Sequence, residues 1–260
     1  MAAEASMGTF LQGLERGLAV IRAFSADAPS LTLSEVARDV GITPATARRI
    51  LLTLEELGYV RSDGRRFSLT PRVLALGWAY LSSLDLGDIA GPFMEELSAK
   101  TRESCSIATL DLPDIVYVAR VPTSRIMTVA LGVGARLPAY ATSMGRVLLA
   151  GLPEEELSAY LESLEAEAHT EHTVTSADEL REVVARAGVD GYALVDQELE
   201  LGLRSIAVPI RDSRGRPVAA LNVSAHASRT SRAALRSDVL HPLQECAESI
   251  STALRRRGRI

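Results

Sequence analysis

The sequence predicts an α+β protein of two domains, with a winged helix-turn-helix near the N-terminus and a mainly antiparallel sheet flanked by helices in the C-terminal part. Three observations lead to this prediction. The chain has 260 residues, enough for two compact domains at roughly 100–200 residues each. Residues 14–69 contain three short helical patterns followed by a hairpin pattern. Further along, strand patterns cluster instead of alternating strictly with helices, which favours an antiparallel sheet.

The composition is typical of a folded globular protein, with 47% hydrophobic and 23% charged residues and a mean hydropathy of +0.12. No apolar run approaches the ~20 residues that cross a bilayer, and the first residues lack the order of a secretory signal. We therefore expect a cytoplasmic protein with no membrane partner. Cys105 and Cys246 have no CxxC spacing, so we expect two small buried side chains and no metal site.

Charge is distributed unevenly along the chain, whose formal net charge is −5. Between residues 38 and 72 there are seven arginines and four carboxylates, so this stretch alone carries +3. A solvated surface would give the same balance, but the helical pattern within the stretch favours nucleic acid as the partner.

Three helices are predicted in this N-terminal part. Apolar residues recur at helical spacing over residues 14–24. Residues 33–40 form a second pattern of about two turns that stops at a glycine. Thr43 is a favoured N-cap and Pro44 suits the first position of a third helix. This order is that of a helix-turn-helix, in which the last helix enters the major groove by its N-terminal residues.

A hairpin is expected after the third helix, with strands at residues 59–61 and 66–69. Asp63 and Gly64 would supply the positive φ angles that a tight turn needs. Arginines at a hairpin tip suit contacts with the DNA backbone or the minor groove, although such arginines can also be merely solubilising. The residues predicted to lie at DNA are Thr43, Pro44, Ala45, Thr46, Arg48, Arg49, Arg61, Arg65 and Arg66. The sequence leaves open which of them contact bases and which contact phosphates.

An apolar helix is predicted over residues 71–86, opened by the cap residue Thr70 and by Pro71. Because a lone linker would not be so apolar, we expect it to pack against its twin in a homodimer or a dimer of dimers. The alternative is that it covers its own domain.

The remaining chain alternates helical and strand patterns. Helices are expected near residues 91–97, 143–151, 154–165, 177–187 and 235–256, and strands at 104–110, 115–120, 127–133, 192–195, 204–210 and 217–224.

Several stretches resemble the IclR family of bacterial transcriptional regulators, particularly its PcaR/PcaU-type branch. They are LERGLAVIRAFS, LTLSEVARDVGITPATARRILLTLEELGYV, LTPRVLALGWAYLSSL, RIMTVALGVGARLPAYATSMGRVLLAGL and GYALVDQELELGLRSIAVPIRD. The resemblance spans about residues 11–254. It implies a DNA-binding domain at 11–70, a linker helix at 71–86, and a GAF-like effector-binding domain at 87–256 with no cofactor.

The resemblance also implies an effector pocket built from Val129, Ser143, Met144, Ser205, Asn222 and Ser224. Backbone N–H groups near a helix N-terminus favour a carboxylate, so we expect a small organic or aromatic acid as effector. Arg146 and Arg204 are the charged candidates near this pocket, whereas each serine by itself could be an ordinary strand hydroxyl. For this branch the resemblance implies control of aromatic-acid catabolism by the β-ketoadipate route, with protocatechuate, 4-hydroxybenzoate, β-ketoadipate or a relative as inducer.

Two other classes of function, an enzyme and a protein-interaction module, fit the sequence less well than a DNA-binding regulator. An enzyme is disfavoured because the chain has no GxSxG, P-loop, HExxH or dinucleotide-binding pattern. His169 and His172 flank Glu171 without a third clear ligand, which is a weak zinc signal. A protein-interaction module would leave the capped third helix and the arginine hairpin unexplained.

Overall fold

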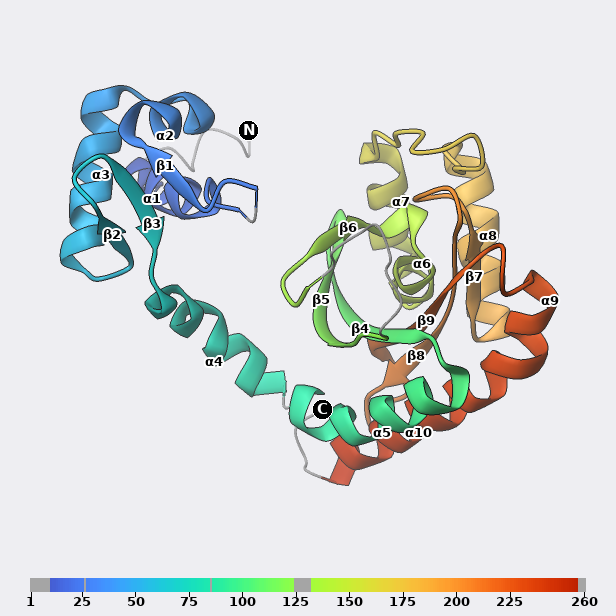
Figure 1. The fold of residues 1–260 in the computed structure, drawn as a ribbon. Coiled ribbons are helices and arrows are strands. Elements are labelled where there is room, and N and C mark those ends of the chain that lie inside the picture. The colour runs from blue at the N-terminus through green and yellow to red at the C-terminus, as the bar shows by residue number, and fades with distance from the viewer. Residues whose placement is uncertain (1–9, 26, 85, 124–131, 257–260) are drawn as a thin grey trace. The chain divides into compact units, whose positions relative to one another are not determined.

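The computed structural model describes residues 10–25, 27–84, 86–123 and 132–256. It divides into two compact units, Met1–Tyr80 and Leu81–Ile260. The division lies within the predicted linker helix. We describe each unit by itself (Figure 1).

The described part of the first unit begins with three helices and a small sheet, and it runs on to Tyr80, within a further helix (Figure 1). Its elements are α1 (Gln12–Arg22), β1 (Ser30–Thr32), α2 (Leu33–Val40), α3 (Pro44–Glu56), β2 (Val60–Ser62) and β3 (Arg66–Leu69). The predicted helices and hairpin are confirmed. Strand β1 was not predicted, and it pairs antiparallel with β3 to give the order β1-β3-β2.

Local signals in the sequence account for the helix ends in this unit. Thr32 and Glu35 form a reciprocal capping box at the start of α2, and Gly41 ends that helix with φ 71°. Thr43 caps α3 by accepting a hydrogen bond from the backbone N–H of Thr46. The turn between α2 and α3 is therefore encoded by adjacent residues.

The hairpin turn differs from the prediction in one respect. Gly64 has φ +95°, but Asp63 is not among the residues with positive φ, so the expectation that both residues supply such angles is wrong. The Asp63 carboxylate instead accepts hydrogen bonds from the backbone N–H groups of Arg65 (3.0 Å) and Arg66 (2.7 Å). An Asp side chain that bonds the backbone ahead of it closes the turn without a strained Asp backbone.

The predicted linker helix opens with a different kind of turn, and residue 85 near its end lies outside the described residues. A single turn, Pro71–Val73, leads into α4 (Leu74–Leu84), and α5 (Leu86–Thr101) follows. Helix α5 begins five residues before the predicted start near Gly91. Burial of Leu86, Ile89 and Ala90 stabilises its first turn, and the local pattern at residues 91–97 does not reveal this burial.

The second unit is built around one six-stranded antiparallel sheet, as predicted. Its strands are β4 (Ser104–Asp111), β5 (Asp114–Val121), β6 (Arg136–Pro138), β7 (Ala193–Asp196), β8 (Leu203–Arg211) and β9 (Pro217–His226). The strand order is β6-β5-β4-β9-β8-β7. Strand β6 was not predicted, and most of the strand expected at residues 127–133 lies outside the described residues.

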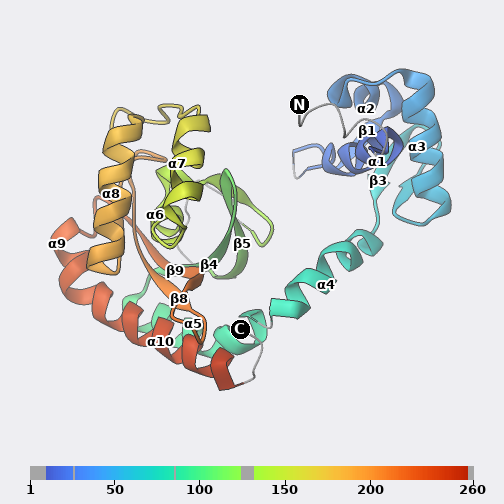
Figure 2. The same cartoon turned by 180° about the vertical axis from the view of Figure 1, so that it is seen from behind.

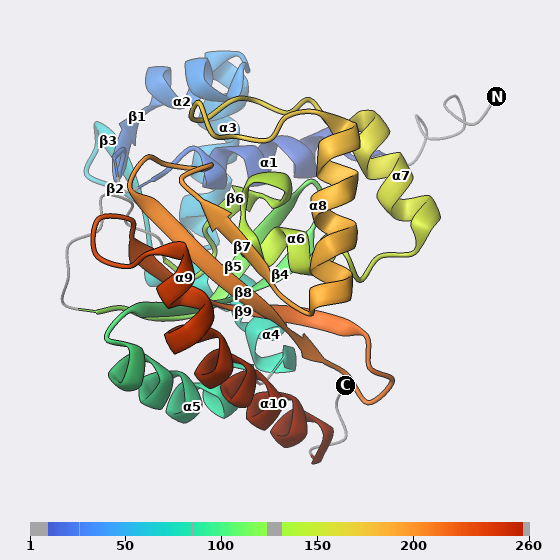
Figure 3. The same ribbon diagram turned by 90° about the vertical axis from the view of Figure 1, so that its right-hand side faces the viewer.

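Helices cover both faces of this sheet (Figures 2 and 3). Helices α5 and α10 (Leu240–Arg256) lie side by side on one face. Helices α6 (Ser143–Leu149), α7 (Glu154–Ser163) and α8 (Ala177–Asp190) lie on the other. The C-terminal helix predicted from residue 235 is preceded by α9 (Arg232–Ala234) and a wide turn, Leu235–Val239.

Successive side chains along each strand point to opposite faces of the sheet, so each face has its own apolar core. On β8, Ile206 and Val208 pack towards α5 and α10, whereas Ala207 packs towards α6. The small side chain lets α6 lie close to the sheet. Gly145 allows a different close approach, between α6 and the turn that precedes it, because a Cβ atom there would lie 2.0 Å from the carbonyl oxygen of Ala139.

Within the described part of the chain, no helix combines the length and the apolar character needed to cross a bilayer.

Candidate nucleic-acid interface and effector pocket

The N-terminal end of α3 presents one face to solvent and the other to the core. The buried face carries Ala47, Leu51 and Leu54. The predicted contact residues are on or near the opposite face: Thr43, Pro44, Ala45, Arg48 and Arg49 are exposed and Thr46 is half-buried. Among the described residues, neither the Arg48 nor the Arg49 guanidinium has a hydrogen bond or an ion pair. Both are therefore available to a phosphate or to a guanine edge.

The three hairpin arginines are all exposed, but they are not equivalent. No partner of the Arg61 or Arg65 side chain is found in the described ranges. Arg66, in contrast, donates to the hydroxyl of Ser30 (3.1 Å) and to its carbonyl oxygen (3.0 Å), and lies 3.5 Å from the Glu35 carboxylate. Hydrogen bonds from Thr32 lower the pKa of Glu35, with Arg66 adding to the effect. Arg66 thus ties the hairpin to β1 and α2.

In the second unit, a cavity of about 30 Å³ brings together residues that are distant in the sequence. Five of the six predicted effector residues line it; the sixth, Val129, lies outside the described residues. The lining comprises Tyr117, Arg120, Leu137, Ala141, Thr142, Ser143, Met144, Val195, Leu199, Leu203, Ser205, Asn222 and Ser224. That these residues bind an effector stays a prediction.

Hydrogen bonds organise the polar side of this cavity. The hydroxyl oxygens of Ser143 and Ser205 lie 2.9 Å apart, which links α6 to β8. Asn222 donates through Nδ2 to the Ser224 hydroxyl at 3.1 Å, while its buried Oδ1 has no hydrogen-bond partner among the residues that the structure describes. A buried acceptor without a partner is uncommon in folded proteins and marks a position where a bound donor would be stabilised.

Tyr117 and Arg120 on β5 were missed by sequence reasoning. Burial raises the pKa of Tyr117 to about 12, and the nearby Arg120 guanidinium opposes this rise. Arg120 is half-buried and makes no hydrogen bond or ion pair with the described residues. Period-two alternation would place positions 117 and 120 on opposite faces of the sheet. A register shift between Ile107 and Ala108 of the paired strand inserts one extra residue in β5, which brings both side chains to the cavity.

The two charged side chains expected near the pocket are engaged elsewhere, and neither lines the cavity. Arg146 is buried, pairs with both carboxylate oxygens of Glu198 at 2.7 and 2.5 Å, and donates to the Tyr140 carbonyl at 2.9 Å. Arg204 pairs with Asp196 at 2.6 and 3.0 Å. That interpretation is corrected: Arg120 is the arginine at the cavity.

Both units match known family models. The model of the IclR helix-turn-helix domain matches residues 13–64, and that of the bacterial transcriptional regulator IclR C-terminal region matches residues 78–252, more than half of the chain. The chain belongs to the IclR family. The predicted resemblance and the α+β fold with a winged helix-turn-helix are thereby confirmed, and this IclR-family member is a DNA-binding transcriptional regulator. Its GAF-like character stays a prediction.

Relatives of this regulator have been described in several bacteria. It is 46% identical to the Pca regulon regulatory protein of Pseudomonas putida over 87% of this chain and 78% of that protein. A solved structure of a candidate transcriptional regulator from Rhodococcus sp. RHA1 is 56% identical, with a TM-score of 0.84, covering 94% of this chain and 98% of that one. An IclR homologue from Microbacterium hydrocarbonoxydans, solved in complex with 4-hydroxybenzoate, is 27% identical, with a TM-score of 0.83 and coverages of 94% and 99%.

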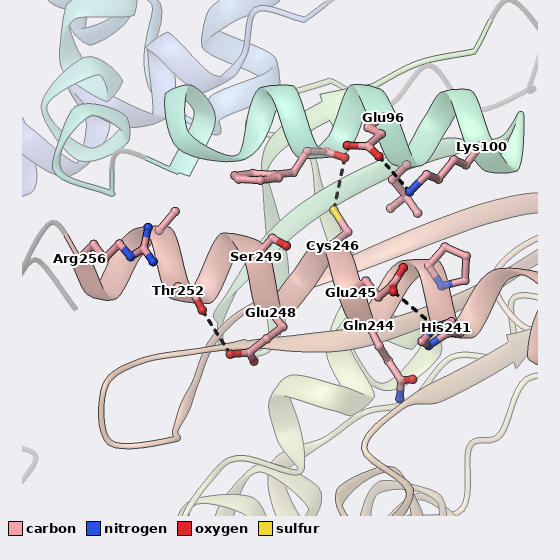
Figure 4. A pocket seen from close by; sticks show the side chains of 14 residues that line it. Glu96, Lys100, His241, Gln244, Glu245, Cys246, Glu248, Ser249, Thr252 and Arg256 are labelled. Carbon is pink, nitrogen blue, oxygen red and sulfur yellow. Dashed lines mark hydrogen bonds and ion pairs between the residues drawn. The ribbon is translucent and has the colours of Figure 1, made fainter.

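A larger groove of about 980 Å³ lies between α5 and α10 of this regulator and contains none of the predicted effector residues. Figure 4 shows two pairs of charged side chains within it. Lys100 lies 2.9 Å from Glu96, and His241 lies 3.4 Å from Glu245. The predicted effector residues therefore gather at the smaller cavity and not at this groove.

The side chains considered for redox or metal chemistry have structural environments. Cys105 and Cys246 are buried, as predicted, and donate to the carbonyl oxygens of Met94 and Phe93. Burial raises the pKa of each thiol to about 12, so both are protonated at neutral pH. Within the described residues, no cluster of three or more His, Cys, Asp or Glu side chains is arranged to hold a metal ion.

Proposed function

We propose that this regulator binds operator DNA through the start of α3 and the β2–β3 hairpin, and that an aromatic acid in the effector pocket changes its DNA affinity. The observation that carries the effector proposal is that Arg120 and Asn222 Oδ1, a cation and an acceptor without partners in the described part of the chain, meet at a single cavity. A hydroxybenzoate offers the matching groups, because its carboxylate pairs with a guanidinium and its phenol donates a hydrogen bond.

The relatives support an effector and a set of target genes of this kind. The Pseudomonas putida relative is named for the Pca regulon, and the Microbacterium structure holds 4-hydroxybenzoate. We infer that this regulator controls genes of aromatic-acid catabolism in the bacterial cytoplasm, where its operator lies. Its effector would be 4-hydroxybenzoate, protocatechuate or a related acid. This is a binding function and needs no catalytic residue.

The small size of the cavity supports a conformational response. About 30 Å³ holds little more than one or two water molecules, so an aromatic ring can enter only when the walls move apart. Leu199 and Leu203 line the cavity at the connection between β7 and β8, which makes this connection a candidate moving part. An effector that favours the opened form shifts the equilibrium between two arrangements and thereby alters operator affinity.

A homodimer is the proposed assembly, and its evidence lies in the first unit. Helix α1 exposes Leu14 and Leu18, which line an apolar groove of about 630 Å³ together with Leu76 of α4. On α4, Leu74 and Trp78 are 75% and 68% exposed. A contiguous apolar surface of this kind is typical of a protein interface. A second copy would cover it and present two α3 helices to a palindromic operator.

In this proposal, residues 11–70 bind DNA, residues 71–86 link the two domains, and residues 87–256 bind the effector.

Sedimentation analysis tests the dimer. We expect Trp78→Glu to shift the protein towards monomer. The control Val189→Glu, at an exposed position on α8, should leave the protein dimeric. A wild-type chain that sediments as a monomer at micromolar concentration would exclude the dimer.

Fluorescence anisotropy of a labelled DNA fragment from upstream of the gene tests the function itself. Protein is titrated at fixed salt with and without 4-hydroxybenzoate, protocatechuate and an aliphatic dicarboxylate. We expect tighter binding than to random DNA, and a shift in affinity with one aromatic acid. Equal affinity for both DNAs would contradict operator binding. A response to the dicarboxylate alone would contradict the aromatic class of effector.

A further inference from the structure

A second cavity of the effector unit shares a wall with the effector pocket. Its volume is about 420 Å³. The segment from β6 to the start of α6 serves both cavities: Leu137 and Ala141 line the effector pocket, whereas Pro138 and Tyr140 line the second cavity. The full lining is Pro113, Asp114, Pro138, Tyr140, Tyr160, Ser163, Leu164, Glu165, Glu167 and His169. Its size falls in the range of small-molecule sites.

The two tyrosines of this cavity differ in their hydrogen bonds. The Tyr140 hydroxyl donates to the Glu167 carbonyl at 2.8 Å, accepts from the Glu167 N–H at 3.0 Å and lies 3.0 Å from His169 Nε2. The Tyr160 side chain is buried, and its hydroxyl has no hydrogen bond within normal geometric limits to any described residue. Burial raises the pKa of Tyr160 to about 12, and the Tyr140 backbone acts in the opposite direction. One neutral hydroxyl at the cavity is therefore left to a ligand by the described part of the chain.

The charge of the cavity is negative. Asp114 is balanced by Arg136, whose Nε lies 3.0 Å from Asp114 Oδ2. Glu165 and Glu167 are exposed at the rim, and neither carboxylate has an ion pair in the described parts of the chain. His169 is the single basic residue in the lining. This charge is opposite to that of the effector pocket, where Arg120 is the charged group.

We propose that the second cavity binds an organic ammonium ion with a small apolar body, such as an arylalkylamine. The Glu165 and Glu167 carboxylates attract the ammonium group, and the Tyr160 hydroxyl oxygen accepts one of its N–H hydrogen bonds. Proline, leucine and tyrosine side chains of the lining cover the apolar body. An anion would be repelled at the same rim, so the two cavities would take ligands of opposite charge.

Isothermal titration calorimetry on the full chain tests this proposal, with phenethylamine as probe and 2-phenylethanol as a neutral probe of the same shape. We expect saturable phenethylamine binding with a Kd of about 1 mM or tighter, weakened by added salt, and much weaker binding of the alcohol. Equal affinity for both probes, or the absence of phenethylamine binding, would overturn the proposal.

Variants locate the binding site. The double variant Glu165→Gln, Glu167→Gln should weaken phenethylamine binding about fivefold, because it removes two exposed charges. Tyr160→Phe should weaken it about threefold without changing the cavity's shape. Glu162→Gln removes an exposed charge at the end of α7, a few residues before Glu165 and outside the lining, and is the matched control. Arg120→Leu should leave amine binding unchanged. Amine binding that changes in Arg120→Leu but not in the Glu165→Gln, Glu167→Gln double variant would place the amine in the effector pocket and refute the site.

Discussion

The start of α3 and the effector pocket hold their functional side chains in opposite ways. At α3, Arg48 and Arg49 are adjacent in the sequence, exposed, and without partners among the described residues. At the pocket, Ser143, Ser205 and Asn222 come from distant elements, are buried, and contact one another or their neighbours. DNA is a large ligand that supplies its own contacts to exposed side chains, whereas a small acid must be enclosed.

This difference indicates at which residues a substitution can change binding without changing the stability of the fold. An exposed side chain without partners contributes little to folding, so its removal should affect DNA binding alone. A buried polar residue also satisfies its neighbours, so its removal affects both folding and binding. The following predictions test this contrast, from the largest expected effect to the smallest.

Glu198→Ala should cause the largest loss of stability, about 3–5 kcal/mol in the unfolding free energy of the effector unit. The change leaves Arg146 buried without its carboxylate partner and removes the acceptor of the Val174 N–H. Urea denaturation followed by circular dichroism measures the loss. Glu200→Ala, in the same connection but outside the buried Arg146–Glu198 pair, is the control. Equal stability of the two variants would show that the pair does not hold this region together.

Arg120→Leu should weaken aromatic-acid binding by about 1.5–3 kcal/mol, because a charge-assisted hydrogen bond to the carboxylate is lost. Operator affinity without effector should stay at the wild-type value. Calorimetry with 4-hydroxybenzoate and anisotropy on operator DNA measure the two quantities. Arg186→Leu, an exposed arginine of α8, is the matched control. Unchanged acid affinity in Arg120→Leu would remove this residue from the effector site.

Arg49→Ala should weaken operator binding by about 1–3 kcal/mol and reduce discrimination if Arg49 contacts a base. If it contacts phosphate instead, affinity falls similarly on all sequences and the salt dependence becomes shallower. Thermal unfolding should be unchanged, in contrast to Glu198→Ala. A variant that retains full specific affinity would show that Arg49 does not contact the operator.

The shared wall predicts a small coupling between the two cavities of the effector unit. Saturating phenethylamine should change the Kd for 4-hydroxybenzoate by about threefold, and the acid should change the amine Kd by the same factor. Reciprocal titrations measure both factors. Identical acid affinities with and without bound amine would show that the wall at residues 137–142 does not transmit the effect.

Sequence reasoning succeeded where the decisive contacts are local. The bounds of α2 were predicted correctly because its capping box and Gly41 lie within a few residues of each end. The family motifs also pointed to five residues that the structure places at one cavity. It failed for β1 and β6, which are three residues long and exist only through pairing with distant strands.

The sequence by itself determined the helix-turn-helix, the hairpin and most strands, because capping, turn chemistry and apolar periodicity act between near neighbours. The tertiary structure alone decided which arginines are free. Arg66 and Arg146 are engaged by partners 36 and 52 positions away, while Arg120 reaches its cavity through a bulge set by the neighbouring strand. Whether an arginine is paired or free therefore depends on how distant segments pack in the folded protein, and a local sequence pattern does not contain this information.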